Sequence, residues 1–121
     1  MKVKIRMPYP GAAISVNHYT GRRKDGGVYV KPEAKQWMDA LGWLIKTQHI
    51  EDWKIPLHVT ISGVFKDLRS CPDIHNLVKV TCDAIEEVTG INDQNYTTET
   101  KEPQIDSNHE PEVIITIQGA D

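Results

Sequence analysis

The sequence predicts a small α/β (α+β) domain with two layers, a mixed β-sheet and two main helices. Three observations support this fold class. Several short segments alternate apolar and polar residues, two longer segments repeat apolar residues every three or four positions, and the two kinds of segment interleave along the chain. The length of 121 residues, with 39% hydrophobic and 26% charged residues, fits one globular domain over residues 1–121.

The elements of the first half follow from pattern and from proline. Val3, Ile5 and Met7 alternate with charged residues, which predicts a half-buried strand that ends at the following prolines. Residues 11–26 lack periodicity and are rich in glycine, so we expect a long loop, followed by a short strand at 28–30. Pro32 suits the first turn of a helix, whose apolar spacing continues to about His49.

The second half contains the clearest strand signal, the alternation over residues 57–65. A polar connection leads to a helix from Leu77 to Val88, which Gly90 ends. We expect three further segments: a strand at 94–101, a polar loop at 103–111, and a final strand at 113–117 that is rich in β-branched residues.

The net charge of −3 hides an uneven distribution. Residues 1–54 hold ten Lys and Arg against five acids, a net +5, whereas residues 55–121 hold four against twelve, a net −8. The acidic total argues against a generic nucleic-acid binder, but the asymmetry is compatible with a polyanion contact on one side and an acidic site on the other.

The sequence predicts a cytoplasmic protein without a membrane partner. No apolar run approaches the roughly 20 residues of a bilayer span, and the charged N-terminus is unlike a signal peptide. Cys71 and Cys82 lack Cys-x-x-Cys spacing, so we expect no disulfide framework. Cys82 falls within the second helical pattern, and we expect it to be a small packed residue.

Polar residues concentrate around the second helix. Asp73, His75 and Asn76 lie at its start, and Asp93 lies just beyond its end. A helix of about 14 residues is about 20 Å long, so Asp93 reaches the first group only if the chain turns back or if a second subunit supplies its own Asp93. This separation is a first reason to consider a dimer.

Lys79 and Asp83 extend this group along one helix face, because residues three and four apart are neighbours. Closely spaced carboxylates repel one another unless a cation lies between them. Mg²⁺ prefers oxygen ligands and can support phosphodiester hydrolysis, with Lys79 neutralising charge on the phosphate.

Each of these residues also has an ordinary structural interpretation. Asp73 suits a helix N-cap, His75 a solvent-facing position, Asp83 an ion pair with Lys79, and Asp93 a turn. Spacing alone leaves a metal site and these structural roles both open, and favours the structural roles.

The arrangement resembles the RusA family of Holliday junction resolvases. That family shows Asp-x-Asp-Asn-Leu-x-Lys, then Asp-Ala-Leu on the same helix, then Gly-x-x-x-Asp-Asp. The corresponding segments here are Asp73-Ile74-His75-Asn76-Leu77-Val78-Lys79, Asp83-Ala84-Ile85 and Gly90-Ile91-Asn92-Asp93. Pro8-Tyr9-Pro10 after the first strand and Val16-Asn17-His18-Tyr19 before a basic loop are also similar to the family.

The resemblance implies a metal-dependent endodeoxyribonuclease that cuts four-way DNA junctions in pairs, during recombination and repair, as a homodimer. It implies Mg²⁺, or Mn²⁺, as cofactor and branched DNA as partner. The resemblance implies four catalytic residues, Asp73, His75, Lys79 and Asp93. Of these, Asp73, His75 and Asp93 would be the metal ligands. Asn76 would position ligands or a water and contact the DNA.

Two basic groups are candidates for holding DNA phosphates. Arg22, Arg23 and Lys24 lie in the glycine-flanked loop, and Lys66 and Arg69 precede the acidic motif. An ordinary solvated loop is the alternative for the first group.

Two departures from the family pattern keep other functions open. His75 and Asn92 stand where the family has acids, and imidazole suits Mn²⁺, Fe²⁺ or Zn²⁺ better than Mg²⁺. A junction-binding protein without catalysis is therefore the second hypothesis. A structural or regulatory protein without DNA affinity is the third, supported by the acidic pI of about 5.9.

Overall fold

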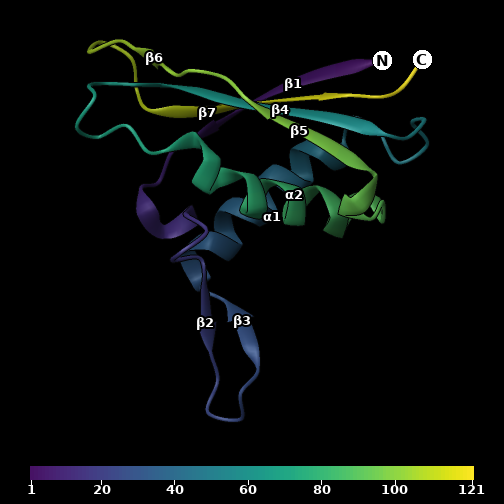
Figure 1. Cartoon of the computed structure of the whole chain (residues 1–121), viewed down its shortest axis with the longest axis horizontal. Coiled ribbons are helices and arrows are strands. Elements are labelled where there is room, and N and C mark those ends of the chain that lie inside the picture. Colours follow the sequence, from purple (N-terminus) through teal and green to yellow (C-terminus); the bar gives the residue numbers. More distant parts are fainter.

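The computed structural model of residues 1–121 has two layers (Figure 1). Helices α1 (Pro32–Lys46) and α2 (Val78–Thr89) cover one face of a five-stranded sheet. The strands are β1 (Lys2–Pro8), β4 (Leu57–Phe65), β5 (Tyr96–Thr100), β6 (Gln104–Ile105) and β7 (Glu112–Gln118). Their order is β1-β7-β4-β5, with β6 also beside β4. Because β4 is antiparallel to β7 but parallel to β5 and β6, the sheet is mixed, and the predicted fold class is confirmed.

The core lies between the sheet and the helices, and strand alternation builds it. Val59 and Ile61 of β4 pair with Ile117 and Ile115 of β7, and all four side chains are fully buried. The intervening residues of both strands face the opposite side of the sheet, which is polar. The strands expected at 57–65 and 113–117 are therefore confirmed.

Helix α1 buries a stripe of apolar residues, among them Trp37, whose indole nitrogen donates a hydrogen bond to the carbonyl oxygen of Pro8 at 2.9 Å. The helix ends at Lys46, three residues before the predicted end, because the backbone tightens into i→i+3 hydrogen bonds there. Trp43, on the same helix, is 67% exposed and so is not a core residue.

A hairpin replaces part of the loop predicted at 11–26. Residues Ala12–Ile14 form a short 3₁₀ helix, and β2 (Thr20–Arg22) pairs antiparallel with β3 (Val28–Val30). The expected strand at 28–30 is confirmed, but its partner strand was missed because three polar residues carry no alternation. The ring of Tyr29 lies against Gly21, where a Cβ atom would come within 2.8 Å of it.

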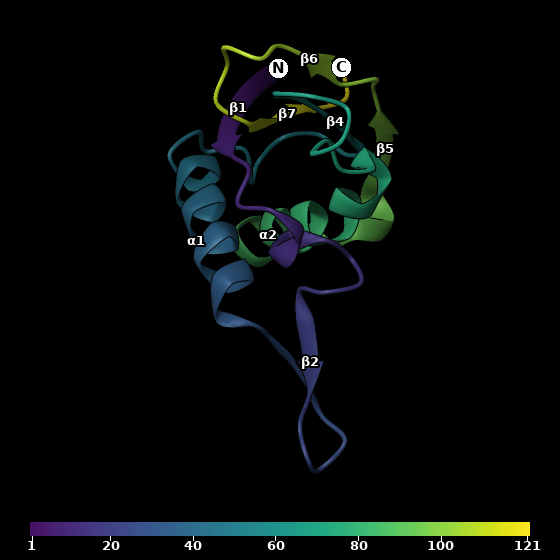
Figure 2. The same cartoon turned by 90° about the vertical axis from the view of Figure 1, so that its left-hand side faces the viewer.

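This hairpin projects from the helical layer, away from the sheet (Figures 1 and 2). Its tip, residues 23–27, is stabilised by local hydrogen bonds, one of them from the backbone of Gly27 to the Asp25 carboxylate at 2.8 Å. The tip thus places its charged side chains far from the sheet.

The second helical region has two parts. A 3₁₀ turn at Ile74–Leu77 precedes α2, and Gly90 ends α2 in the left-handed region with φ +73°. A second 3₁₀ turn at Asp93–Asn95 then leads directly into β5. The predicted helix and its stop are confirmed, whereas the loop at 103–111 contains the short strand β6. No helix is both long and apolar enough to span a bilayer.

Candidate active site

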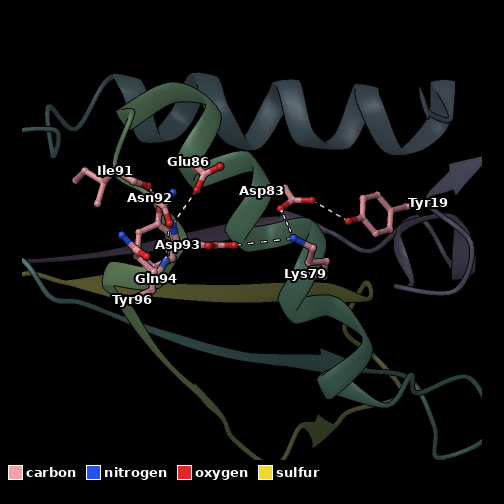
Figure 3. Close-up of polar contacts among 9 residues, drawn as sticks. All are labelled: Tyr19, Lys79, Asp83, Glu86, Ile91, Asn92, Asp93, Gln94 and Tyr96. Carbon is pink, nitrogen blue, oxygen red and sulfur yellow. Dashed lines mark hydrogen bonds and ion pairs between the residues drawn. The ribbon is translucent and has the colours of Figure 1, made fainter. Parts of the chain in front are cut away.

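The Lys79 ammonium group lies between two carboxylates (Figure 3). Its Nζ atom is 3.0 Å from Oδ1 of Asp83, one helical turn away, and 3.9 Å from Oδ2 of Asp93. The Asp83 hydrogen bond is the main reason that the pKa of Lys79 is raised, against a smaller opposing effect of burial. The lysine is therefore a protonated, half-exposed cation between two acids.

Asp93 reaches Lys79 because the chain turns back after α2. Gly90 adopts the left-handed conformation that a glycine favours, and the Asn92 side chain accepts a hydrogen bond from the backbone of Gln94 at 2.9 Å. The backbone N–H of Asp93 donates to Oε1 of Glu86 at 2.7 Å (Figure 3). The sequence allowed Asp93 to approach the helix-start residues either by a turn of its own chain or from a second subunit. In the structure the chain turns back, and this turn brings Asp93 as far as Lys79.

Tyr19 is the residue of this group that the sequence did not single out for a role. Its side chain is 5% exposed, and its hydroxyl group donates a hydrogen bond to Oδ2 of Asp83 at 2.7 Å. Burial, and then this hydrogen bond, raise the pKa of the tyrosine far above its ordinary value, so the hydroxyl remains a donor. Sixty-four residues separate the partners, and no sequence pattern signals such a contact. Asp83 itself was expected to pair with Lys79, and does.

Asp73, His75 and Asn76 lie around the 3₁₀ turn that precedes α2. Asp73 is the N-cap of that turn, and its Oδ1 accepts a hydrogen bond from the backbone N–H of His75 at 3.1 Å. The carbonyl oxygen of Asn76 accepts a hydrogen bond from Val16 at 2.8 Å, which ties the turn to the segment before the hairpin. Asp73 and His75 are exposed, so the capping role leaves their side chains accessible.

The expected metal ligands Asp73, His75 and Asp93 do not form one cluster. No three His, Cys, Asp or Glu side chains in the structure are grouped to hold a metal ion. The donor chemistry still fits a hard cation, because Mg²⁺ often binds through one or two carboxylates and completes its shell with phosphate oxygens and water. Asp73 precedes Lys79 in the sequence and Asp93 follows it, and the carboxylates of both are exposed.

The basic residues predicted to hold DNA fall in two places. Arg22, Arg23 and Lys24 are exposed at the end of the β2–β3 hairpin, which projects away from the helices (Figure 2). Lys66 and Arg69 are exposed on the connection from β4 to the 3₁₀ turn, where Lys66 lies 3.8 Å from a carboxylate oxygen of Glu110.

A protein-family model described as endodeoxyribonuclease RusA matches the chain over residues 8–118. The chain belongs to the RusA family. The search of curated proteins finds no match. The matched range runs from the end of β1 to the end of β7, so the RusA match includes the hairpin, the 3₁₀ turn, α2 and the returning segment with Asp93. The predicted family resemblance is confirmed.

Within this RusA fold, Tyr19, Lys79, Asp83 and Asp93 form one connected polar group, and Asp73 with His75 lies at the start of the same helical region.

Proposed function

We propose that the protein is a metal-dependent endodeoxyribonuclease that resolves Holliday junctions and other branched DNA in recombination and repair. The observation that supports this most directly is the family match across the segment in which Lys79 lies between Asp83 and Asp93. In the reaction a water oxygen bonds to phosphorus and one ester P–O bond breaks. The products are a phosphate monoester end and a hydroxyl end.

Lys79 is the residue that we assign to the phosphate. Its ammonium group is half-exposed, and the hydrogen bond to Asp83 raises its pKa and so favours the charged form, which can stabilise negative charge that builds up on the phosphate oxygens. Asp73 and Asp93, with His75, are the proposed ligands of Mg²⁺ or Mn²⁺. Such an ion supplies Lewis-acid stabilisation and a more acidic water. Asn76 is proposed to position these groups.

The DNA-binding surface in this proposal has two parts. The hairpin end with Arg22, Arg23 and Lys24 would contact phosphates remote from the cut, and Lys66 and Arg69 would contact those nearer to it. A four-way junction is two-fold symmetric, so a homodimer would present one such site to each of two strands.

A cleavage assay tests the proposal. The purified full chain with Mg²⁺ or Mn²⁺ should nick a labelled synthetic four-way junction at symmetric positions, and Asp73→Asn should abolish the cuts. Asp39→Asn is the matched control, because Asp39 is an exposed acid on α1 that pairs only with Lys35. Binding of the junction without cleavage in any divalent ion would disprove the nuclease function.

That outcome would support the second hypothesis, a junction-binding protein without catalysis, which His75 and Asn92 favour. The exposed position of His75 and the capping role of Asn92 allow both to be replaced by aspartate without loss of structure, since aspartate also caps. Isothermal calorimetry of Mg²⁺ binding then separates the hypotheses. A nuclease should bind the ion in the wild type, whereas a pure binder should gain binding only in the His75→Asp, Asn92→Asp variant.

A further inference from the structure

Three hydrogen-bonding or ionic contacts connect the root of the hairpin with the candidate active site. Tyr19 directly precedes β2, and its carbonyl oxygen accepts a hydrogen bond from the backbone of Lys31, just after β3, at 2.9 Å. Its hydroxyl group reaches across to Asp83, which in turn holds Lys79 beside Asp93 (Figure 3). One buried residue thus closes the hairpin and contacts the acid that holds the lysine.

Lys79 needs such support because a lysine side chain is long and flexible. An exposed i,i+4 ion pair is too weak to keep both partners in one rotamer. The Lys79 and Asp83 side chains are 53% and 29% exposed, so the pair by itself is of this weak kind.

The Tyr19 hydroxyl changes the situation for Asp83. The carboxylate uses Oδ2 for the tyrosine and Oδ1 for the lysine, at 2.7 Å and 3.0 Å. The tyrosine ring is fixed in the core cluster, so its hydroxyl group is a stationary donor. A carboxylate fixed at one oxygen presents the other in a defined direction, and that direction brings the lysine towards Asp93.

We propose that Tyr19 is a positioning residue for Lys79, acting through Asp83. This inference rests on the proposed function only in taking Lys79 as the group that meets the phosphate. Tyr19 does not touch the reacting atoms. It aligns the cation that does, from the same position that holds the two strands of the DNA-binding hairpin together.

The variant Tyr19→Phe tests this, because it keeps the buried ring and removes only the hydroxyl group. We expect single-turnover cleavage of bound junction DNA to fall about tenfold, with the Kd for the junction unchanged within twofold. In the free protein, NMR relaxation of the Lys79 Cε methylene should show the side-chain order falling to that of exposed lysines. Tyr9→Phe is the matched control, because Tyr9 lies outside the hairpin, its ring packs edge-on against Phe65, and its hydroxyl group makes no hydrogen bond.

Asp83→Asn gives an independent check if Tyr19→Phe is poorly folded. It should lower cleavage and Lys79 order in the same direction, and the double variant should be no worse than Asp83→Asn alone, because both changes break one chain of contacts. The proposal is overturned if Tyr19→Phe leaves Lys79 as ordered as in the wild type. It is equally overturned if cleavage falls only through weaker junction binding, since Tyr19 would then act through the hairpin. The NMR measurement needs neither DNA nor metal, so it decides even for a protein that does not cleave.

Discussion

Replacing Lys79 by methionine should separate function from stability. The substitution keeps a flexible side chain of similar length and removes the charge. Lys79, Asp83 and Asp93 are 53%, 29% and 44% exposed, so solvent screens both ion pairs. The i,i+4 pair with Asp83 is worth about 0.3–0.5 kcal/mol, and the longer contact with Asp93 less.

The repulsion that is left between the two carboxylates adds a similar small amount. We therefore expect a loss below about 1 kcal/mol, which corresponds to a melting temperature lowered by at most about 5 °C for a domain of this size. Cleavage should respond very differently. Removing one group that stabilises transition-state charge typically lowers kcat by about 10²–10³. Thermal unfolding followed by circular dichroism and single-turnover cleavage of a four-way junction measure the two quantities.

Lys35→Met is the matched control. Lys35 also lies between two carboxylates, Asp39 at 2.9 Å and Glu87 at 3.0 Å, and its side chain is 45% exposed. It should lose a comparable amount of stability and none of the cleavage. The reasoning is refuted if Lys79→Met cleaves within twofold of the wild type, or if it loses more than about 3 kcal/mol of stability, which would make Lys79 a structural residue.

Three further results are expected. Gly90→Ala should lower stability by about 1 kcal/mol in thermal melts, because φ +73° strains a Cβ-bearing residue, and Gly90→Asn should recover most of the loss; equal stability of the alanine variant would contradict this. Changing Arg22, Arg23 and Lys24 to alanine should reduce the slope of log K against log salt by up to about 3 in mobility-shift titrations, and an unchanged slope would remove the hairpin from the interface. Burial raises the pKa of Cys82 to about 11, so its thiol should resist iodoacetamide at pH 8 in the folded protein and react once urea unfolds it; labelling at the rate of an unfolded thiol would show that α2 opens.

The fold was largely predictable because its main elements are amphipathic in their own sequence. Strand β4 alternates over its first seven residues, and α1 begins at a proline and repeats apolar residues every turn. The partner strand of the hairpin was not predictable in this way. Thr20–Arg22 buries no apolar face, and the ring of Tyr29 on the partner strand lies where a Cβ of residue 21 would be, a contact that no alternation signals.

The site was predictable along the helix and not across the chain. Lys79 and Asp83 are four residues apart, so helical geometry alone brings them together. The position of Asp93 could not be predicted from helical spacing, because it follows from a turn at the left-handed Gly90 and from the hydrogen bond of its backbone to the Glu86 side chain. The contact of Tyr19 with Asp83 could not be predicted either, because it joins two segments that are distant in the sequence and share no pattern.

The charge asymmetry of the sequence does not become one basic and one acidic face. Lys2, Lys4 and Arg6 of β1 lie on the open face of the sheet, and Arg6 is paired there with Glu112. The hairpin cations lie beyond the helical layer on the other side. Six of the ten basic residues of the first segment therefore lie on two opposite surfaces.

Of these two groups, the hairpin cations are the ones on the side of the sheet where α2 carries Lys79. DNA affinity rises with the number of phosphates that a protein neutralises, so a single chain with a small cluster of hairpin cations should hold DNA weakly at physiological salt. Two chains bound to one junction would double the number of phosphate contacts and link their free energies, because the second chain binds at a high effective concentration. The distribution of charge thus suggests a second role for the proposed homodimer, which is to increase DNA affinity as well as to cut two strands. The homodimer would supply the additional phosphate contacts that one acidic chain of 121 residues lacks.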